Sequence, residues 1–321
     1  MKVTVLGCGR WASFHAWYQA EILKNDVLVW GLDDVLFREI STTRKNEYLT
    51  MPSSVNFTTD LPEAIAHAEY IIISISAQAM PVFSKKIAEC APMGKTFVLC
   101  MKGIIDNSGE RLSEVLEREI DPNNHIAVWV GPGHVQEFVK GIPNIMLIDS
   151  KDAAVTARVA AAFKSKTIRL YEGEDLIGAE IGAAAKNVLG IVAGMLDASG
   201  YTCLKGALMA RGAHEVARLV VAMGGKMITA YGLSHLGDFE ATLFSQNSCN
   251  RRYGETFIKK ETTKYLAEGV ATSKAMHLLA QKYKVDMPIC GLCYEVLHEG
   301  KSPKDGMTEL FERKSGKEFC F

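Results

Sequence analysis

Six short, continuously apolar runs divide the first half of the chain, and helix-forming stretches separate them. Runs that are apolar throughout, without polar alternation, indicate strands buried on both faces, as in a parallel sheet covered by helices. Alternation of strand and helix predicts an α/β fold with a doubly wound sheet of the Rossmann type. The expected strands are residues 3–6, 27–32, 70–75, 96–101, 126–130 and 144–148.

This pattern stops at about Glu174. Helical runs rich in small residues, Leu, Val and Met follow at 178–200 and 206–223, and strand signals vanish. A length of 321 residues also fits about two domains. The sequence therefore predicts an N-terminal Rossmann-type domain over residues 1–172, followed by an all-α domain over residues 173–321.

Composition indicates which classes of partner and which cellular location to expect for this protein. The chain has 36 Lys and Arg against 37 Asp and Glu, whereas a nucleic-acid-binding face usually leaves a basic excess, so nucleic acid is not expected as a partner. No apolar run reaches the ~20 residues of a membrane span, because Lys186 interrupts the best candidate at 181–196. The first residues show no signal-peptide cleavage pattern. We therefore expect a cytoplasmic protein without membrane insertion.

The eight cysteines are scattered, several of them in apolar runs where a thiol acts as a small buried hydrophobe. Cys290 and Cys293 form a Cys-x-x-Cys, but no second pair completes a four-ligand zinc site. A thioredoxin-like pair would instead need a helix start after a strand. We expect both thiols on one face of an apolar helix at 288–297, and no metal site.

The first predicted strand runs directly into Gly7-Cys-Gly9-Arg-Trp-Ala12. In this dinucleotide fingerprint Gly7 permits the tight turn, Gly9 lets backbone approach a pyrophosphate, and Ala12 allows close packing of helix on sheet. The helix N-terminus then faces the anion. Because this motif lies between a predicted strand and a predicted helix at the start of the chain, it favours nucleotide binding over a turn without a ligand.

Asp33 follows Ala12 at about the 20-residue distance usual for an acid that binds the ribose. A carboxylate there accepts from the 2′-hydroxyl and repels a 2′-phosphate, so the sequence favours NAD(H). Arg44 and Lys45 are close enough in sequence to keep NADP(H) as the alternative. Asp33 and Asp34 could also only solvate a loop.

Two lysines stand where lysines are unusual. Lys102 follows a buried strand directly, at the end where open α/β sheets bind ligands, although a solvated strand-end lysine is the alternative. Lys186 interrupts a helix of small and apolar residues, where burial lowers the pKa of an amine towards a useful acid–base range. Asn187, its neighbour, can hydrogen-bond a ligand.

A later stretch of small and polar residues contains Asp238 and Thr242, and Asn250-Arg251-Arg252 follows it. Asp238 could hold the Lys186 ammonium group. The hydroxyl, amide and guanidinium groups suit a phosphate, although alone the stretch would as readily be a solvated loop.

Together these motifs resemble the NAD(P)-dependent sn-glycerol-3-phosphate dehydrogenases, of the bacterial type that supplies phospholipid synthesis. The likeness covers essentially the whole chain. Related hydroxyacid and phosphogluconate dehydrogenases carry the Asn further along the lysine helix, not adjacent as in Lys186-Asn187. The motifs are Gly7-Cys-Gly-Arg-Trp11, Cys100-Met-Lys-Gly-Ile104, Gly131-Pro132, Glu180-Ile-Gly-Ala-Ala-Ala-Lys-Asn-Val188, Gly194-Met-Leu-Asp197, Leu236-Gly-Asp238, Asn250-Arg-Arg-Tyr-Gly254, Ala267-Glu-Gly269 and Met287-Pro-Ile289.

The resemblance implies reversible hydride transfer that reduces dihydroxyacetone phosphate to sn-glycerol 3-phosphate. It implies Lys186 as the general acid, Lys102 as a second positive charge near the C2 oxygen, and Asp238 as the residue that orients Lys186. The implied substrate-binding residues are Lys102, Gly131, Gly133, Lys186, Asn187, Asp238, Thr242, Asn250 and Arg251. The implied dinucleotide-binding residues are Gly7, Gly9, Arg10, Trp11, Ala12, Asp33, Lys102, Val135 and Glu268. The family also implies a homodimer.

The sequence departs from the family pattern at three places. Cys249 stands where the family usually has an Arg that contacts phosphate and cofactor, so Arg251 or Arg252 would have to supply that charge. Gly133 replaces a hydroxyl residue, and Ala12 stands where Gly is common. Cys249 and Gly133 keep open a sister dehydrogenase acting on another small phosphorylated or anionic ketone. A non-catalytic redox sensor is a third hypothesis, and for Cys249 a redox switch is the alternative to a spacer thiol.

Overall fold

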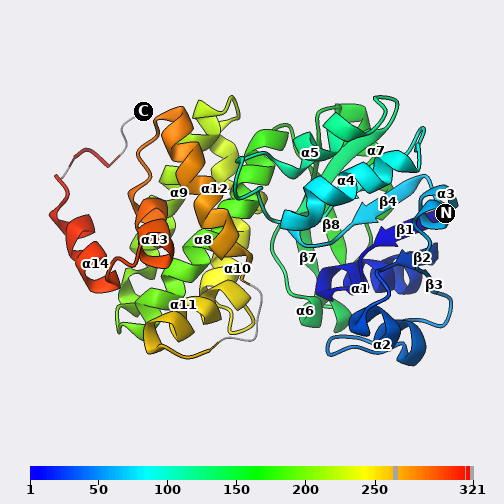
Figure 1. Cartoon of the computed structure of the whole chain (residues 1–321), viewed down its shortest axis with the longest axis horizontal. Helices are drawn as coiled ribbons and strands as arrows, with labels where there is room; N and C mark the ends of the chain where they lie inside the picture. The colour runs from blue at the N-terminus through cyan, green and yellow to red at the C-terminus, as the bar shows by residue number, and fades with distance from the viewer. Residues whose placement is uncertain (263–266, 315, 319–321) are drawn as a thin grey trace. The chain divides into compact units, whose positions relative to one another are not determined.

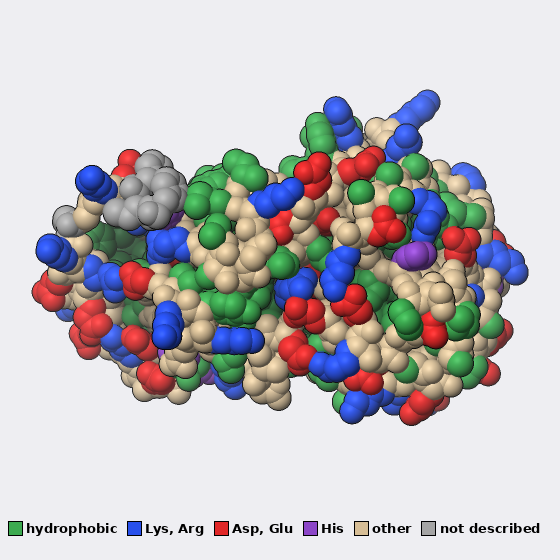
Figure 2. All heavy atoms as spheres, turned by 90° about the horizontal axis from the view of Figure 1, so that it is seen from above, with side chains coloured by type: hydrophobic (Ala, Val, Ile, Leu, Met, Phe, Trp, Pro, Cys, Tyr) green, Lys and Arg blue, Asp and Glu red, His purple; other side chains and the backbone are tan. Residues whose placement is uncertain are grey.

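The computed structural model describes residues 1–262, 267–314 and 316–318. The chain forms two compact units: unit 1 comprises Met1–Met101 and Arg111–Leu176, and unit 2 comprises Lys102–Glu110 and Ile177–Phe321 (Figure 1). The segment Lys102–Glu110 belongs to unit 2, although it lies within residues 1–172, which the sequence assigns to the first domain. Basic and acidic side chains are mixed over the face shown in Figure 2, as the formal net charge of −1 leads one to expect.

Unit 1 is built on an eight-stranded sheet in the order β3-β2-β1-β4-β5-β6-β7-β8. The central order is that of a dinucleotide-binding doubly wound sheet. Its strands are β1 (Lys2–Leu6), β2 (Asp26–Trp30), β3 (Asn56–Thr58), β4 (Tyr70–Ile73), β5 (Thr96–Leu99), β6 (His125–Val130), β7 (Asn144–Ser150) and β8 (Ile168–Glu172). Its helices are α1 (Arg10–Trp17), α2 (Val35–Thr43), α3 (Leu61–His67), α4 (Met80–Glu89), α5 (Leu112–Glu119), α6 (Val135–Val139) and α7 (Ala153–Phe163).

The six predicted strands are all present, but the sheet differs from the prediction in two ways. The strands β3 and β8 were not predicted, because both are edge strands whose residues, apart from the buried Ile168, are exposed or half-buried and form no continuous apolar run. The sheet is also not wholly parallel, since β7 pairs antiparallel with β6.

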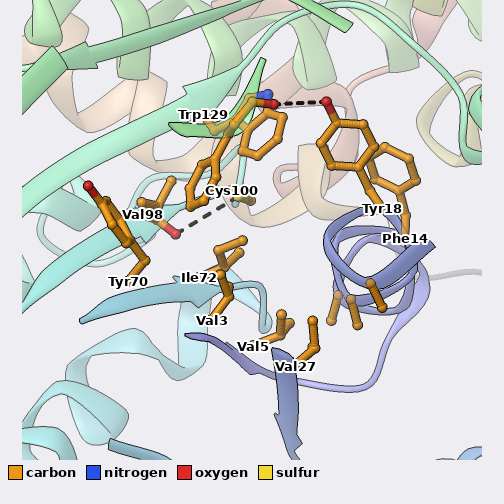
Figure 3. Packing of buried hydrophobic residues seen from close by; sticks show 14 of the residues in the cluster. Val3, Val5, Phe14, Tyr18, Val27, Tyr70, Ile72, Val98, Cys100 and Trp129 are labelled. Atoms are coloured by element: carbon orange, nitrogen blue, oxygen red, sulfur yellow. Dashed lines mark hydrogen bonds between the residues drawn. The ribbon is translucent and has the colours of Figure 1, made fainter. Parts of the chain in front are cut away.

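Helices cover both faces of this sheet. Val3 and Val5 point to one face, and Thr4 between them points to the other, where its hydroxyl donates to the carbonyl of Ala64 on α3 at 2.8 Å. On the first face the hydroxyl of Tyr18 donates to the carbonyl of Phe163 on α7 at 2.8 Å. Figure 3 shows part of this core, in which sheet residues Val3, Val5, Val27, Ile72, Val98 and Trp129 pack with Phe14 and Tyr18.

Unit 2 is helical in its described part and is organised around α8 (Leu176–Ala198). This helix is long and apolar enough to cross a membrane, but 83% of its most apolar window is buried inside the protein, which is typical of a core helix. The other helices are α9 (Lys205–Ala222), α10 (Asp238–Phe244), α11 (Cys249–Lys259), α12 (Glu268–Tyr283), α13 (Pro288–His298) and α14 (Pro303–Glu312). These features confirm the predicted fold class.

The predicted apolar helix that carries Cys290 and Cys293 is also present. Cys290 and Cys293 lie on α13, and both side chains are buried in the core of unit 2. Burial raises the pKa of each thiol, that of Cys293 to about 12, so neither is a reactive thiolate at neutral pH. Cys320 lies outside the described residues.

One face of α8 carries glycine or lysine at every fourth residue: Gly182, Lys186, Gly190 and Gly194. Residues four apart lie on the same face of a helix, so the glycines flank Lys186. A Cβ on Gly190 would lie 2.8 Å from Thr242, and a Cβ on Gly194 would lie 1.9 Å from the carbonyl oxygen of Arg251. The glycines therefore let α10 and α11 approach the backbone of α8.

The variant Gly194→Ala tests this packing. We expect it to lower the free energy of unfolding by about 1–3 kcal/mol, because the new methyl group meets the backbone of α11. Gly206→Ala on α9 is the matched control, since a Cβ there meets nothing within 4 Å. Urea unfolding of both variants measures the difference, and equal stabilities would contradict the packing argument.

Candidate active site

Lys186 extends from the glycine face of α8 and is only 9% exposed. Its ammonium group donates to Oδ1 of Asp238 at 3.2 Å and to Oγ1 of Thr242 at 2.9 Å. The same hydroxyl of Thr242 donates to the carbonyl of Asp238 at 2.8 Å. The helix α10 therefore supplies both partners of the buried amine, from positions one turn apart.

Lys102 approaches the same carboxylate from the other side. Its Nζ donates to Oδ2 of Asp238 at 2.6 Å. Lys102 opens the segment Lys102–Glu110, which belongs to unit 2 although it follows β5 in sequence. One buried carboxylate thus bridges two ammonium groups, and the cluster retains net positive charge.

The protonation of this cluster follows from burial and pairing. Burial lowers the pKa of Lys186 to about 8, although the neighbouring Asp238 carboxylate raises it. Burial acts to raise the pKa of Asp238, but Lys102 and Lys186 outweigh it, so this pKa lies below its usual value. Near neutral pH Lys186 is therefore mostly protonated and Asp238 is ionised, which suits proton donation to a substrate oxygen.

Two side-chain amides continue from this cluster. Asn187 donates from Nδ2 to the backbone carbonyl of Lys102 at 2.7 Å and accepts at Oδ1 from Asn250 Nδ2 at 2.9 Å. Asn250 in turn accepts from the backbone N–H of Gly269 at 2.9 Å. Both amides, predicted as substrate ligands, thus connect α8 to the Lys102 segment, to α11 and to α12. Glu268, predicted to contact the dinucleotide, begins α12 beside Gly269, and its charge acts on Lys186.

The two arginines proposed to replace the family's Arg differ in their partners. Arg251 is held by the carboxylates of Asp197 (Nε to Oδ2, 2.7 Å) and Glu255 (Nη2 to Oε1, 2.6 Å). The guanidinium of Arg252 instead lies against the side chain of Cys249, with Nη2 3.8 Å from Sγ. Arg252 therefore brings a positive charge to the side chain at position 249, whereas Arg251 serves a structural ion-pair network.

The sequence did not point to two buried residues of unit 2, Lys205 and His235. The ammonium group of Lys205 pairs with the carboxylate of Asp197 at 2.6 Å. His235, three residues before Asp238, is fully buried and bonded to the carbonyl of Gly182. A single histidine or lysine in a mixed stretch carries no periodic or spacing signal, so only the tertiary contacts find these residues.

In unit 1 the nucleotide-binding fingerprint has the expected geometry. Gly7 has a φ of +123°, and a Cβ there would lie 2.3 Å from the carbonyl oxygen of Ser74. A Cβ on Gly9 would meet nothing within 4 Å, so the backbone in front of α1 is open to a ligand. Ala12, in α1, is buried and is the small residue that allows close packing of this helix on the sheet. These residues fit the pyrophosphate of a dinucleotide.

Three further predicted dinucleotide contacts, Arg10, Trp11 and Val135, also belong to unit 1. Arg10 donates to Oε1 of Gln136 at 3.0 Å, and Trp11 packs edge-on against Phe138. Val135 begins α6 and is completely buried.

The two predicted pocket glycines, Gly131 and Gly133, have φ values of +133° and +138°. A Cβ on Gly131 would lie 3.0 Å from the backbone of Met146, and one on Gly133 would lie 2.5 Å from the ring of Phe138. Glycine is therefore required at both positions by the backbone and the packing alone.

Asp33 is exposed and forms a two-point ion pair with Arg38, at 2.6 Å to Nε and 2.7 Å to Nη2. This arginine was not predicted. Arg44, one of the predicted phosphate cations, instead donates to the carbonyls of Pro52 and Val55. Arg38 is thus the arginine that pairs with Asp33.

A Gly-x-Gly-x-x-Ala loop on a doubly wound sheet and a buried lysine–carboxylate cluster in a helical unit are features expected of a nicotinamide-dependent dehydrogenase. Two family models match: the NAD-dependent glycerol-3-phosphate dehydrogenase N-terminus over residues 2–156, and its C-terminus over residues 175–308. The chain belongs to the NAD-dependent glycerol-3-phosphate dehydrogenase family. This confirms the family and the oxidoreductase class that the sequence predicts.

Individual relatives agree. The glycerol-3-phosphate dehydrogenase [NAD(P)+] of Thermoanaerobacter sp. (strain X514) is 34% identical over 98% of this chain and 97% of its own. That of Listeria innocua is 36% identical over 98% and 96%. The crystal structure of glycerol-3-phosphate dehydrogenase from Coxiella burnetii superposes with a TM-score of 0.91 at 25% identity, covering 97% of this chain and 99% of the other. The yeast enzyme shares the fold, with a TM-score of 0.79 at 18% identity over 98% and 99% of the chains.

Asp238→Asn tests the charge balance of the cluster. At pH 7 we expect a loss of about 3–5 kcal/mol in the free energy of unfolding, because two buried cations lose their anion. The folded pKa of Asp238 is lowered, so its contribution is present above the ordinary value of 3.8 and is lost as the pH falls through the folded value. The difference between wild type and variant should therefore shrink in acid.

Urea unfolding across this pH range is the measurement. Glu240→Gln is the control, because Glu240 is an exposed acid on the same helix. If Asp238→Asn were as stable as the control at pH 7, the charge-balance account would be wrong.

Proposed function

We propose that this protein reduces dihydroxyacetone phosphate to sn-glycerol 3-phosphate, reversibly, with a reduced nicotinamide dinucleotide. The observation that carries the proposal is the buried Lys186, with a pKa of about 8, held by Asp238 and Thr242. Family membership supports the substrate, because the relatives are named for glycerol 3-phosphate.

In the proposed mechanism Lys186 donates a proton from Nζ to the C2 oxygen of the substrate. An acid with a pKa of about 8 is mostly protonated near neutral pH and gives up its proton more readily than an ordinary lysine. Lys102 adds a second positive charge where negative charge develops on that oxygen. When bound, the reduced nicotinamide supplies the hydride. In the reverse direction neutral Lys186 takes the proton back.

We propose that the loop around Gly7 and Gly9, with Arg10 and Trp11, holds the dinucleotide. NAD(H) is the proposed preference, because the Asp33 carboxylate can accept from a ribose hydroxyl and repels a 2′-phosphate. NADP(H) is the alternative, since Arg38 lies beside that carboxylate and offers a charge to a phosphate.

The replacement of the family's Arg by Cys249 favours one second candidate. A sister dehydrogenase of the same fold would act on another small phosphorylated or anionic ketone. A substrate panel separates the two, because a ketone other than dihydroxyacetone phosphate would then have the higher kcat/KM.

The family also supports a cellular setting. We propose a cytoplasmic homodimer that is not inserted in the membrane and that supplies glycerol 3-phosphate for phospholipid synthesis. Sedimentation velocity tests the dimer, and fractionation of cells tests the location.

Oxidation of NADH and NADPH with dihydroxyacetone phosphate tests the reaction and the cofactor preference together. We expect turnover in the wild type, and a kcat about 10²–10⁴-fold lower in Lys186→Met, because the proton donor is lost. Binding of NADH, followed by fluorescence, should be retained. Lys259→Met, which removes an exposed lysine of α11, is the control. Retained turnover in Lys186→Met would overturn the assignment of the acid.

Arg252→Gln tests the phosphate end of the site. We propose that this arginine binds the substrate phosphate in place of the family's Arg, because its guanidinium contacts Cys249. Loss of a charge-assisted contact should raise the KM for dihydroxyacetone phosphate about ten- to a hundredfold with a smaller change in kcat. Arg118→Gln on α5, half-exposed, is the control. An unchanged KM in Arg252→Gln would exclude this role.

A further inference from the structure

A π-helical turn, η5 (Leu233–Gly237), leads directly into Asp238 and contains the fully buried His235. The Nδ1 atom of His235 lies 2.9 Å from the backbone carbonyl oxygen of Gly182 on α8. A carbonyl only accepts, so Nδ1 carries the proton and donates it. Burial lowers the pKa of this imidazole to about 4, so the ring is neutral at pH 7.

The hydrogen bond between His235 and Gly182 lies one helical turn away from Lys186. Gly182 lies one turn before Lys186 on the same face of α8, and a Cβ on Gly182 would lie 2.7 Å from the Cβ of His235. The imidazole also stacks on Phe239 of α10, with ring centroids 5.7 Å apart. The ring therefore fastens the turn that carries Asp238 to the turn of α8 that precedes Lys186.

The other ring nitrogen makes no such connection. In the part of the chain that the structure describes, Nε2 of His235 is buried without a hydrogen-bond partner. All directional contact between this side chain and α8 thus passes through Nδ1.

We propose that His235 is a positioning residue whose Nδ1–H bond to Gly182 keeps Asp238 within reach of Lys186, so that Lys186 holds its proton for the substrate. The proposal rests on the proposed role of Lys186 as the general acid. It assigns a task to a side chain that does not itself contact the reacting atoms.

The charges around Lys186 explain the expected effect. Asp238 on α10 and Glu268 on α12 favour its protonated form, whereas burial and Lys102 disfavour it, and His235 is neutral. If the turn drifts from α8, the attraction of Asp238 weakens while burial and Lys102 remain. Lys186 would then lose its proton at lower pH.

The experiment compares His235→Asn, His235→Gln and His235→Ala. The amide nitrogen of Asn stands as many bonds from Cα as Nδ1 does, so Asn can still donate to Gly182, whereas the nitrogen of Gln corresponds to Nε2. We expect the alkaline limb of the kcat profile for ketone reduction to move down by about 0.5–1 pH unit in the Ala and Gln variants. The Asn variant should keep the wild-type limb, and KM for NADH should stay unchanged in all three.

A second pair of variants leaves His235 in place. Gly182→Ala puts a methyl group against His235 and should shift the limb in the same direction. Gly291→Ala on α13, where a Cβ meets nothing within 4 Å, is the control and should shift nothing. This pair decides the question if the His235 variants fail to fold.

Titration of the Lys186 ¹³Cε signal, in lysine-labelled protein and assigned through Lys186→Met, separates this proposal from the proposed reaction. Absence of wild-type turnover with dihydroxyacetone phosphate would reject the reaction, and the titration of Lys186 in the variants would still test the positioning role. An unchanged titration and limb in folded His235→Ala, or equal shifts in the Asn and Gln variants, would overturn the proposal.

Discussion

The helical unit depends on the burial of one ammonium group. Lys186 sits on a helix whose neighbours are small or apolar, where an unpaired charge would cost several kcal/mol. The carboxylate of Asp238 and the hydroxyl of Thr242 offset that cost, and Lys102 completes the cluster. Since burial still dominates, the amine has a pKa of about 8 and becomes a usable acid near neutral pH.

That pairing is short-ranged, so the surrounding helices must approach α8 closely. Gly190 and Gly194 permit this approach from α10 and α11. On α11, Gly254 is needed for the same reason, since a Cβ there would lie 2.0 Å from the carbonyl oxygen of Ile191 on α8. The small residues around Lys186 therefore have a structural role. They let the neighbouring helices pack closely enough for the carboxylate and amide partners to reach the lysine.

Several features could be predicted because they are local. The Gly7 turn, the apolar strands and the isolated Lys186 each carry a signal within a few residues. The edge strands β3 and β8 could not be predicted, because half-exposed strands lack the continuous apolar run used to find them. The partners of charged residues were also hidden: Arg251 and Arg252 are adjacent in sequence, yet one pairs with Asp197 and the other contacts Cys249.

Backbone preference and hydrophobic pattern act over short distances, so the sequence alone predicts the alternation of strand and helix, the glycine loop before α1 and Lys186 as the proposed acid. Which charges meet depends instead on the tertiary structure. It brings Lys102 into the helical unit and joins it to Asp238, 136 residues later. It also sets His235 against Gly182. Such encounters depend on how helices pack through space, because Coulomb attraction and hydrogen bonding depend on distance in space and not on separation along the chain.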